Sequence, residues 1–281
     1  MRTSAGERLR RVAGLLGVTA LQLLGMVGPQ LAVAQGQPRS AAADARTQAP
    51  YDPTGYWVSL ITQDWRFRMV VPGRGEYIGI PINAKAKEFA DAWQAAPDVA
   101  AGKQCEAYGA AALMQIPERL HITWRDANTL EVQTDAGMQT RELYFQPSAA
   151  QKTAEQSWQG NSMARWAMFV QPRGSGRELA TLNLAQASKP PPPVGSIVVT
   201  TSDMPPGLLR KNGMPYSSQA TLTEYWEGQT DPVAGTRLLI ITSELKDPVY
   251  LQGPYVFNTV FEKEADGSKW DPSPCSLTSD P

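Results

Sequence analysis

The sequence predicts a mainly β protein: an antiparallel barrel of about eight to nine strands, one short helix and a long Pro/Gly-rich insertion. Short alternating or apolar runs bounded by turn residues recur between residues 51 and 275, which is the pattern of β-strands. A single stretch shows clear helical spacing, and residues 147–195 have a linker-like composition. We expect the strands to close into a barrel, because closure removes exposed sheet edges.

The first 34 residues read as an export signal. Arg8, Arg10 and Arg11 precede an apolar stretch at residues 12–28, and the small residues 32–34 fit a cleavage site. The Arg10-Arg11 pair leaves open whether export follows the ordinary or the twin-arginine route. We therefore expect a periplasmic or secreted protein with a flexible leader at residues 35–50 and a single barrel domain at residues 51–281.

The first half of that domain contains both element types. Residues 56–61 and 65–71 are predicted strands separated by Gln63-Asp64, so we expect them to form a hairpin. Asn83 is a good helix cap, and Phe89 and Trp93 lie four residues apart on one face, so residues 83–93 are the clearest helix. The alanine-rich residues 108–114 fit a short helix or a packed turn.

Tight turns separate the strands that follow. Residues 120–124, 130–134 and 139–145 form a predicted three-stranded meander. Four consecutive prolines at residues 190–193 close the insertion at residues 147–195, which we expect to be mostly loop. Further strand signals occur at residues 196–201, 220–226, 237–243 and 255–261.

The entry to the first strand supports a particular kind of barrel. Gly55-Tyr56-Trp57 resembles the G-x-W motif with which lipocalins and other calycin barrels begin, and this resemblance implies that Trp57 plugs one end of the barrel. Residues 64–68, 120–124 and 222–225 make the chain similar to secreted bacterial proteins of unknown function. That resemblance covers most of residues 51–275 and supplies no catalytic residues.

Charge limits the classes of partner. Without residues 1–34 the chain has 22 Lys+Arg and 26 Asp+Glu, a net charge of about −4, and it has no basic run. Nucleic acid and anionic membrane need a concentrated positive face, so we expect neither as a partner. After signal cleavage no stretch approaches the ~20 apolar residues of a spanning helix. The sequence leaves the oligomeric state open.

Two cysteines, Cys105 and Cys275, occur in a chain that we expect to be exported. In an oxidising compartment a pair of cysteines predicts one disulfide, which here would tie the middle of the chain to its C-terminal part. Two thiols as zinc ligands would need further His or Cys residues, and the chain has a single histidine. We expect no metal.

Acid/base chemistry would depend on Glu224 and His121. Period-2 alternation puts Glu224 on the face of Leu222 and Trp226, where burial would raise its pKa toward that of a general acid or base. His121 is the only imidazole, but alternation turns it away from its apolar neighbours. The structural interpretations are an ion pair of Glu224 with Arg66, Arg68 or Arg141 and a surface histidine. In the catalytic interpretation Arg141 would steady developing negative charge.

Aromatic residues suggest a ligand-binding wall. The chain has eight Trp and nine Tyr, many of them on predicted strands. Core filling accounts for most of these, but some could line a pocket for a flat or apolar molecule. The candidates are Trp65, Trp124, Tyr225 and Trp226.

These observations favour a binding protein that holds a small hydrophobic or aromatic molecule in the barrel cup. One alternative is a cofactor-independent lyase, isomerase or hydratase that uses Glu224 and His121 as its acid/base pair. A second is a structural envelope module with a filled barrel. We expect no cofactor, because no nucleotide-binding glycine motif occurs and because ATP and reduced nicotinamide are scarce outside the cytoplasm.

Overall fold

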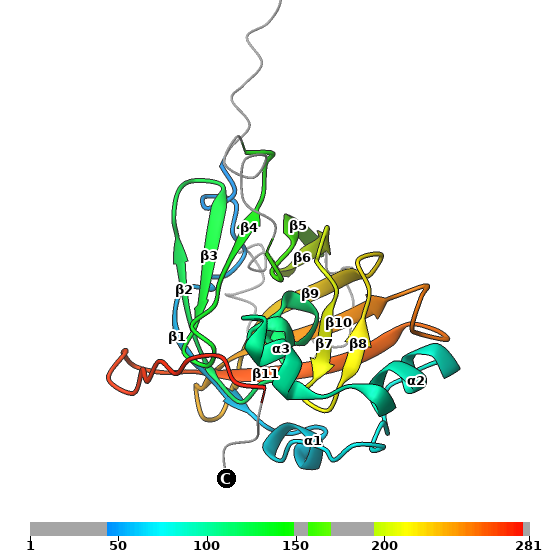
Figure 1. The fold of residues 1–281 in the computed structure, drawn as a ribbon. Coiled ribbons are helices and arrows are strands. Elements are labelled where there is room, and N and C mark those ends of the chain that lie inside the picture. The colour runs from blue at the N-terminus through cyan, green and yellow to red at the C-terminus, as the bar shows by residue number, and fades with distance from the viewer. Residues whose placement is uncertain (1–43, 149–156, 170–193, 278–281) are drawn as a thin grey trace, which may run out of the picture. The chain divides into compact units, whose positions relative to one another are not determined.

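A closed nine-stranded barrel forms the body of the protein in the computed structural model, which describes residues 44–148, 157–169 and 194–277 (Figure 1). The strand order around the barrel is β1-β11-β10-β9-β6-β5-β4-β3-β2. The barrel strands are β1 Gly55–Leu60, β2 Arg119–Trp124, β3 Thr129–Thr134, β4 Thr140–Tyr144, β5 Asn161–Phe169, β6 Val194–Ser202, β9 Thr221–Thr230, β10 Arg237–Lys246 and β11 Tyr255–Lys263. The predicted mainly β barrel is thus confirmed, while the predicted export signal at residues 1–34 lies outside the described residues.

One pair of strands departs from the predicted antiparallel arrangement. β4 and β5 run parallel, with Leu143 opposite Ser162, so the barrel is mixed. Parallel neighbours need a connection of about a dozen residues or more, because the chain must return to the end at which the first strand began. The connection at residues 145–160 is long enough for this, whereas a tight hairpin turn is not. β5 itself lies inside the insertion that was predicted to be mostly loop.

The predicted strand at residues 65–71 is wrong. Trp65–Met69 form a short helix, α1, after Asp64 takes a left-handed conformation with φ of 50°. The backbone N–H groups of Phe67 and Arg68 both donate to the Asp64 carbonyl. Alternation predicts a strand only when one face is buried, and no residue of α1 is buried. β1 therefore pairs with β11 and β2 instead of forming a hairpin with this segment.

Small elements accompany the barrel. The predicted helix is confirmed as α2 Ala84–Ala92, and the Asn83 side chain caps it by accepting from the Ala86 N–H. The alanine-rich segment forms a short helix, α4 Ala110–Leu113. Further elements are α3 Ala95–Ala100, the 3-10 turn η1 Glu106–Tyr108 and the hairpin β7 Gly207–Arg210 with β8 Met214–Tyr216. Among the described residues no helix is long and apolar enough to span a membrane.

Two hydrophobic clusters hold these parts together. The larger one fills the barrel and includes Trp57, Trp226 and Phe261. The second joins the ends of β9, β10 and β11 to the β7–β8 hairpin, with Leu222, Leu245 and Tyr216 among its members. Burial of this apolar surface stabilises the fold at roughly 25 cal/mol per Å².

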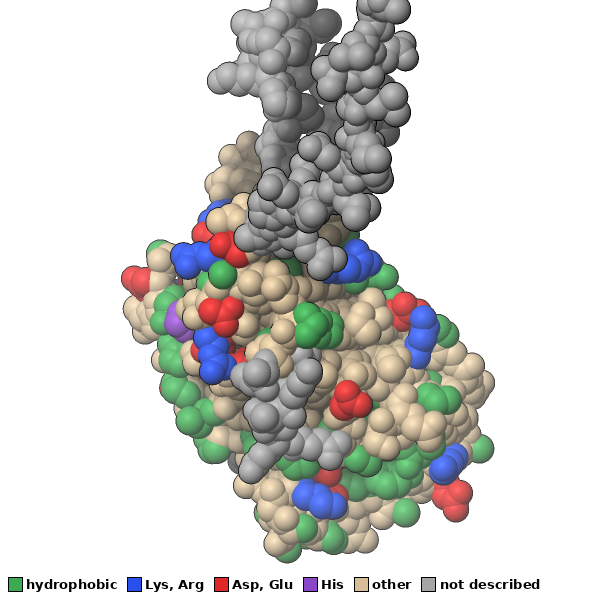
Figure 2. Space-filling view, turned by 90° about the horizontal axis from the view of Figure 1, so that it is seen from above, with side chains coloured by type: hydrophobic (Ala, Val, Ile, Leu, Met, Phe, Trp, Pro, Cys, Tyr) green, Lys and Arg blue, Asp and Glu red, His purple; other side chains and the backbone are tan. Residues whose placement is uncertain are grey.

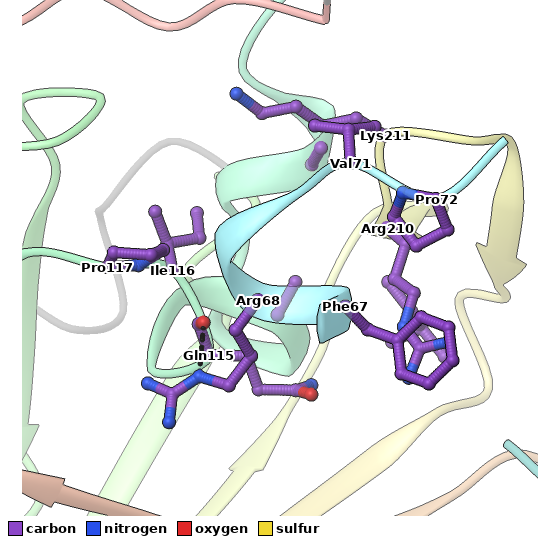
Figure 3. A pocket seen from close by; sticks show the side chains of 12 residues that line it. Phe67, Arg68, Val71, Pro72, Gln115, Ile116, Pro117, Arg210 and Lys211 are labelled. Carbon is purple, nitrogen blue, oxygen red and sulfur yellow. Dashed lines mark hydrogen bonds between the residues drawn. The ribbon is translucent and has the colours of Figure 1, made fainter. Parts of the chain in front are cut away.

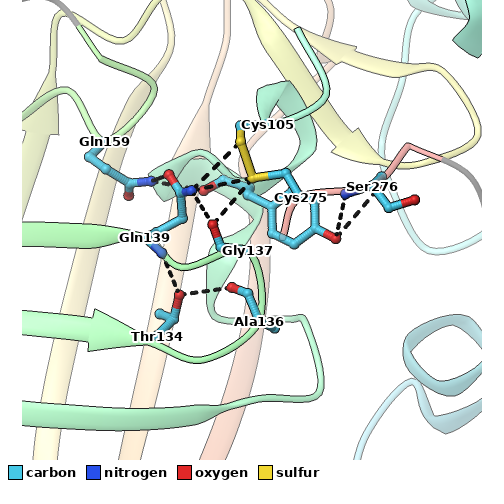
Figure 4. The surroundings of a disulfide bond; sticks show 9 residues. Cys105, Thr134, Ala136, Gly137, Gln139, Gln159, Cys275 and Ser276 are labelled. Atoms are coloured by element: carbon cyan, nitrogen blue, oxygen red, sulfur yellow. Dashed lines mark hydrogen bonds between the residues drawn. A yellow bond between two sulfur atoms is a disulfide. The ribbon is translucent and has the colours of Figure 1, made fainter. Parts of the chain in front are cut away.

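The predicted disulfide between Cys105 and Cys275 is confirmed (Figure 4). It joins η1 to the C-terminal segment across a sequence separation of 170 residues. The Gln139 side-chain amide lies beside it, donating to the Gly137 carbonyl at 2.6 Å and to Cys275 Sγ at 3.4 Å. Gly137 permits this packing, because a Cβ there would lie 2.3 Å from the Tyr108 ring.

Candidate ligand-binding site

Arg141 and Glu224 meet inside the barrel. Arg141 comes from β4 and Glu224 from β9, and both side chains have zero exposure. Arg141 Nη1 donates to Glu224 Oε1 at 3.1 Å, and Nη2 donates to Oε2. Thr201 and Ser162 accept further hydrogen bonds from the guanidinium at 2.8 and 3.2 Å. This geometry is that of the structural ion pair, with the two oxygens of the carboxylate engaged by one guanidinium.

His121 lies elsewhere, on the outer face of the sheet. Its ring stacks on that of Tyr56, with centroids 4.2 Å apart and planes inclined by 7°. His121 Nδ1 lies 3.2 Å from the side-chain oxygen of Gln133. Strand alternation directs its neighbours Leu120 and Ile122 into the core, where both have zero exposure. The structure therefore does not bring His121 to Glu224, and a catalytic role for either stays a prediction.

The four predicted wall aromatics do not gather at one site. Trp226 is fully buried in the barrel core, whereas Tyr225, next to it on β9, is 40% exposed. Trp65 lies on α1 and is 63% exposed. Trp124 packs against Phe145 with ring centroids 5.5 Å apart. A ligand wall made of these residues has no common surface in the described part of the chain.

Side chains fill the barrel interior. Each barrel strand except β5 contributes inward-facing apolar or ion-paired side chains that are at most 1% exposed. They include Trp57, Leu120, Ile122, Leu130, Val132, Leu143, Ile197, Val199, Glu224, Trp226, Leu239, Ile241 and Phe261. Close packing of this kind leaves little room for an organic ligand among these residues.

A pocket of about 110 Å³ lies outside the barrel (Figure 3). All of its lining residues belong to α1, η1, α4, β7 or the connections that adjoin them. They are Phe67, Arg68, Val71, Pro72, Ala107, Ala112, Gln115, Ile116, Pro117, Leu209, Arg210 and Lys211. Small-molecule sites commonly combine apolar walls with a few polar groups, as this pocket does.

Arg68 links α1 to the floor of the pocket. Its Nε donates to the backbone carbonyl of Gln115 at 2.8 Å (Figure 3). Its Nη1 and Nη2 are buried without a hydrogen-bond partner among the described residues. Burial lowers the pKa of Arg68, and the nearby Glu118 opposes this shift. Arginine nevertheless stays protonated in proteins, so Arg68 holds a partly buried positive charge.

Tyr255 and Glu118 lie next to the floor of the pocket but do not line it. The Gln115 side-chain oxygen accepts a hydrogen bond from Tyr255 at 3.0 Å. Glu118, next to the pocket residue Pro117, is 5% exposed, and both of its carboxyl oxygens are without hydrogen-bond partners among the described residues. Burial raises the pKa of Glu118 well above its usual range; Asp135 adds to this effect and Arg68 opposes it. Glu118 and Asp64 are the carboxyl groups whose charge acts on Arg68, and neither forms an ion pair with it among the described residues.

Two further cations line the opposite edge of the pocket. Arg210 Nη1 donates to the Ile78 carbonyl at 2.9 Å, and its guanidinium lies 4.9 Å from the centroid of the Phe67 ring. Lys211 Nζ lies 4.9 Å from the centroid of the Tyr108 ring. These contacts hold both side chains with carbonyl and aromatic partners, which leave their positive charge in place.

The sequence pattern does not reveal this pocket. The alternation of Arg68 with Phe67 and Met69 predicts a strand, whereas these residues form the helical turn from which Arg68 reaches Gln115. Lys211 lies in the turn of the short β7–β8 hairpin, whose strands are buried throughout and show no alternation. The available signal is weak: the lining cations are Arg68 and the adjacent pair Arg210-Lys211, which lie far apart in the sequence.

No metal cluster explains the site. Within the described ranges no group of three or more His, Cys, Asp or Glu side chains is placed to hold a metal ion.

The face shown in Figure 2 carries Lys and Arg side chains interspersed with Asp and Glu. Comparisons of the chain with protein-family models, curated proteins and solved structures found no match. The fold thus defines a closed-barrel protein, and its lipocalin-like family membership stays a prediction.

Proposed function

We propose that this is an exported small-molecule-binding protein whose ligand occupies the pocket beside α1. The observation that carries the proposal is a pocket with apolar walls and a polar floor, made by segments far apart in the sequence. Phe67, Ile116 and Leu209 supply the apolar surface, and Gln115 and Arg68 the polar groups. This combination is what small-molecule sites use for affinity and orientation.

This proposal moves the ligand out of the barrel cup. The cup was the expected location because many barrels of this size hold one small ligand. Here Trp226, Phe261 and the Arg141–Glu224 pair occupy the interior. An external pocket keeps the predicted class of function while the packed barrel acts as a rigid scaffold for the loops.

Export is supported by the disulfide. Disulfides persist in oxidising compartments and are rare in the cytosol of most cells. The Cys105–Cys275 bond also fixes η1, whose residue Ala107 lines the pocket. An exported protein gains in this way a pocket wall that is tied covalently to the C-terminal segment.

A filled-barrel structural module is the second candidate. The same packed interior and the fully buried Arg141–Glu224 pair favour it, because a barrel without a cup is suited to be a stable envelope component. The two candidates differ in one property. The binding protein has a ligand at the pocket, and the structural module has none.

Ligand-observed NMR with a panel of small aromatic and aliphatic molecules, half of them carboxylates and half neutral, separates the candidates. We expect some members to bind, and binding to be lost in Val71→Trp, which fills the pocket. Val233→Trp is the matched control, because Val233 is 95% exposed and does not line the pocket. Failure of the whole panel to bind, together with no co-purified small molecule in native mass spectrometry, would favour the structural module.

A further inference from the structure

Three cations and no carboxylate line the pocket. Arg68, Arg210 and Lys211 are lining residues, whereas no Asp or Glu is among them. None of the three forms an ion pair with a carboxylate in the described part of the chain. Surface cations elsewhere in the protein do pair with carboxylates, as Lys87 does with Asp91 and Arg66 with Glu76. The pocket therefore concentrates positive charge in a chain whose net charge is negative.

We propose that the ligand is a small organic carboxylate, whose negative charge is attracted by Arg68, Arg210 and Lys211 and whose apolar body lies against Phe67 and Ile116. This inference rests on the proposed function and names the chemical class of its ligand. The carboxylate supplies an ion-pair partner, which none of the three cations has among the described residues. The apolar walls exclude water from one side, which strengthens the attraction.

Arg68 gives the strongest support for an anion. Two of its three guanidinium nitrogens are buried without hydrogen-bond partners among the described residues. Unsatisfied buried donors of a charged group raise the free energy of the folded state. An anion in the pocket offsets part of that free-energy cost through its charge. It offsets more of the cost when the Arg68 side chain turns and donates hydrogen bonds to the anion directly.

Size argues for a small acid. A volume of about 110 Å³ is well below the roughly 300–1,000 Å³ of pockets for drug-sized ligands. The apolar lining of Val71, Pro72 and Leu209 gives a fully hydrated inorganic anion no favourable contact. A short or singly ringed monocarboxylate satisfies both the charge and the apolar walls.

Isothermal titration calorimetry with matched acid and amide pairs tests the inference. The probes are benzoate with benzamide, isobutyrate with isobutyramide, and inorganic phosphate. We expect at least one acid to bind tenfold or more tightly than its amide, with phosphate weaker than that acid. The acid-to-amide ratio should fall toward one in Lys211→Met and in Arg68→Met. Lys246→Met removes an exposed cation outside the pocket and should leave the ratio unchanged.

The outcomes are distinguishable. Amides that bind as tightly as their acids, with binding still lost in Val71→Trp, overturn the carboxylate inference and leave the proposed function standing. Tighter binding of phosphate than of either acid also overturns it, in favour of an inorganic anion site. If none of these probes binds to the unaltered protein, both proposals are overturned. Circular dichroism and thermal unfolding establish that each variant is folded, and Lys211→Met tests the charge even where Arg68→Met unfolds.

Discussion

Arg141 on β4 and Glu224 on β9 form a fully buried ion pair that joins strands far apart in the sequence. Both guanidinium Nη atoms donate to the carboxylate, and Ser162 and Thr201 accept two further hydrogen bonds from the guanidinium. Arg141 thus has three partners, Glu224, Ser162 and Thr201, whereas Glu224 is held by Arg141 through both of its oxygens. The ion pair accounts for a glutamate that alternates with leucine and tryptophan on β9.

Breaking this pair should destabilise the protein strongly. We expect Glu224→Gln to lower the free energy of unfolding by about 3–5 kcal/mol, because it leaves the Arg141 charge buried without a counter-charge. The double variant Arg141→Met/Glu224→Leu should recover most of this loss. Urea unfolding followed by fluorescence measures both values. Lys87→Met, which breaks an exposed pair, is the control and should cost less than about 1 kcal/mol. An equally small effect of Glu224→Gln would contradict the burial of the pair.

The disulfide should contribute substantially to stability. Replacing both Cys105 and Cys275 with serine should lower the free energy of unfolding by about 3–5 kcal/mol, since the bond closes a loop with a sequence separation of 170 residues. The same unfolding experiment with and without reductant on the unaltered protein provides the control. Identical curves under the two conditions would show that the bond does not form.

Glu106 should make stability depend on pH near neutrality. Burial, and then the charge of Asp98, raises the pKa of Glu106 to about 7, while Lys103 and Trp93 oppose the shift. Tyr216 on β8 also faces this carboxyl group. A raised pKa means that the folded state binds the proton more tightly, so its contribution is present below the unfolded pKa and is lost as pH rises toward and past 7.

The measurable consequence is a dependence of the free energy of unfolding on pH that one substitution removes. Between about pH 4.5 and pH 8 the unaltered protein should lose on the order of 1–2 kcal/mol relative to Glu106→Gln. Glu88→Gln on the exposed face of α2 is the matched control and should follow the unaltered protein. Parallel curves for Glu106→Gln and the unaltered protein would refute a raised pKa at this position.

Gly137 should be sensitive to any side chain, for steric reasons. Its φ is +75°, and a Cβ would lie 2.3 Å from a Tyr108 ring atom beside the disulfide. Gly235 has a φ of +70° with nothing within 4 Å of its Cβ position, so Gly235→Ala isolates the backbone strain of about 1 kcal/mol. We expect Gly137→Ala to cost at least about 2 kcal/mol more than this control, as overpacking does. Equal costs in urea unfolding would show that Tyr108 moves aside freely.

The sequence predicted the barrel because its signals are local. Alternation in residues 120–134 and 222–226 places one apolar face inside, and the tight turns there set the pairing of neighbouring strands. The disulfide followed from a count of two cysteines. Asn83 predicted its helix because its side chain caps the first turn directly.

The pocket could not be predicted because it depends on long-range contacts. Arg68 meets Gln115 only after the left-handed Asp64 turns residues 65–69 into a helix, and no periodicity encodes that meeting. Likewise, Lys211 reaches the site through a hairpin that is buried on both faces. The sequence offers Arg66, Arg68 and Arg141 as possible partners of Glu224, and the strand order around the barrel brings Arg141 to it.

The location of the ligand is the central claim, and chemical-shift mapping tests it most directly. Benzoate and isobutyrate would be titrated into ¹⁵N-labelled protein while amide shifts are followed. We predict that the largest shifts fall on residues 67–72, 112–117 and 209–211, which surround the pocket. Shifts concentrated instead on residues 222–226 and 239–243, whose inward side chains fill the barrel, would contradict a site outside the barrel.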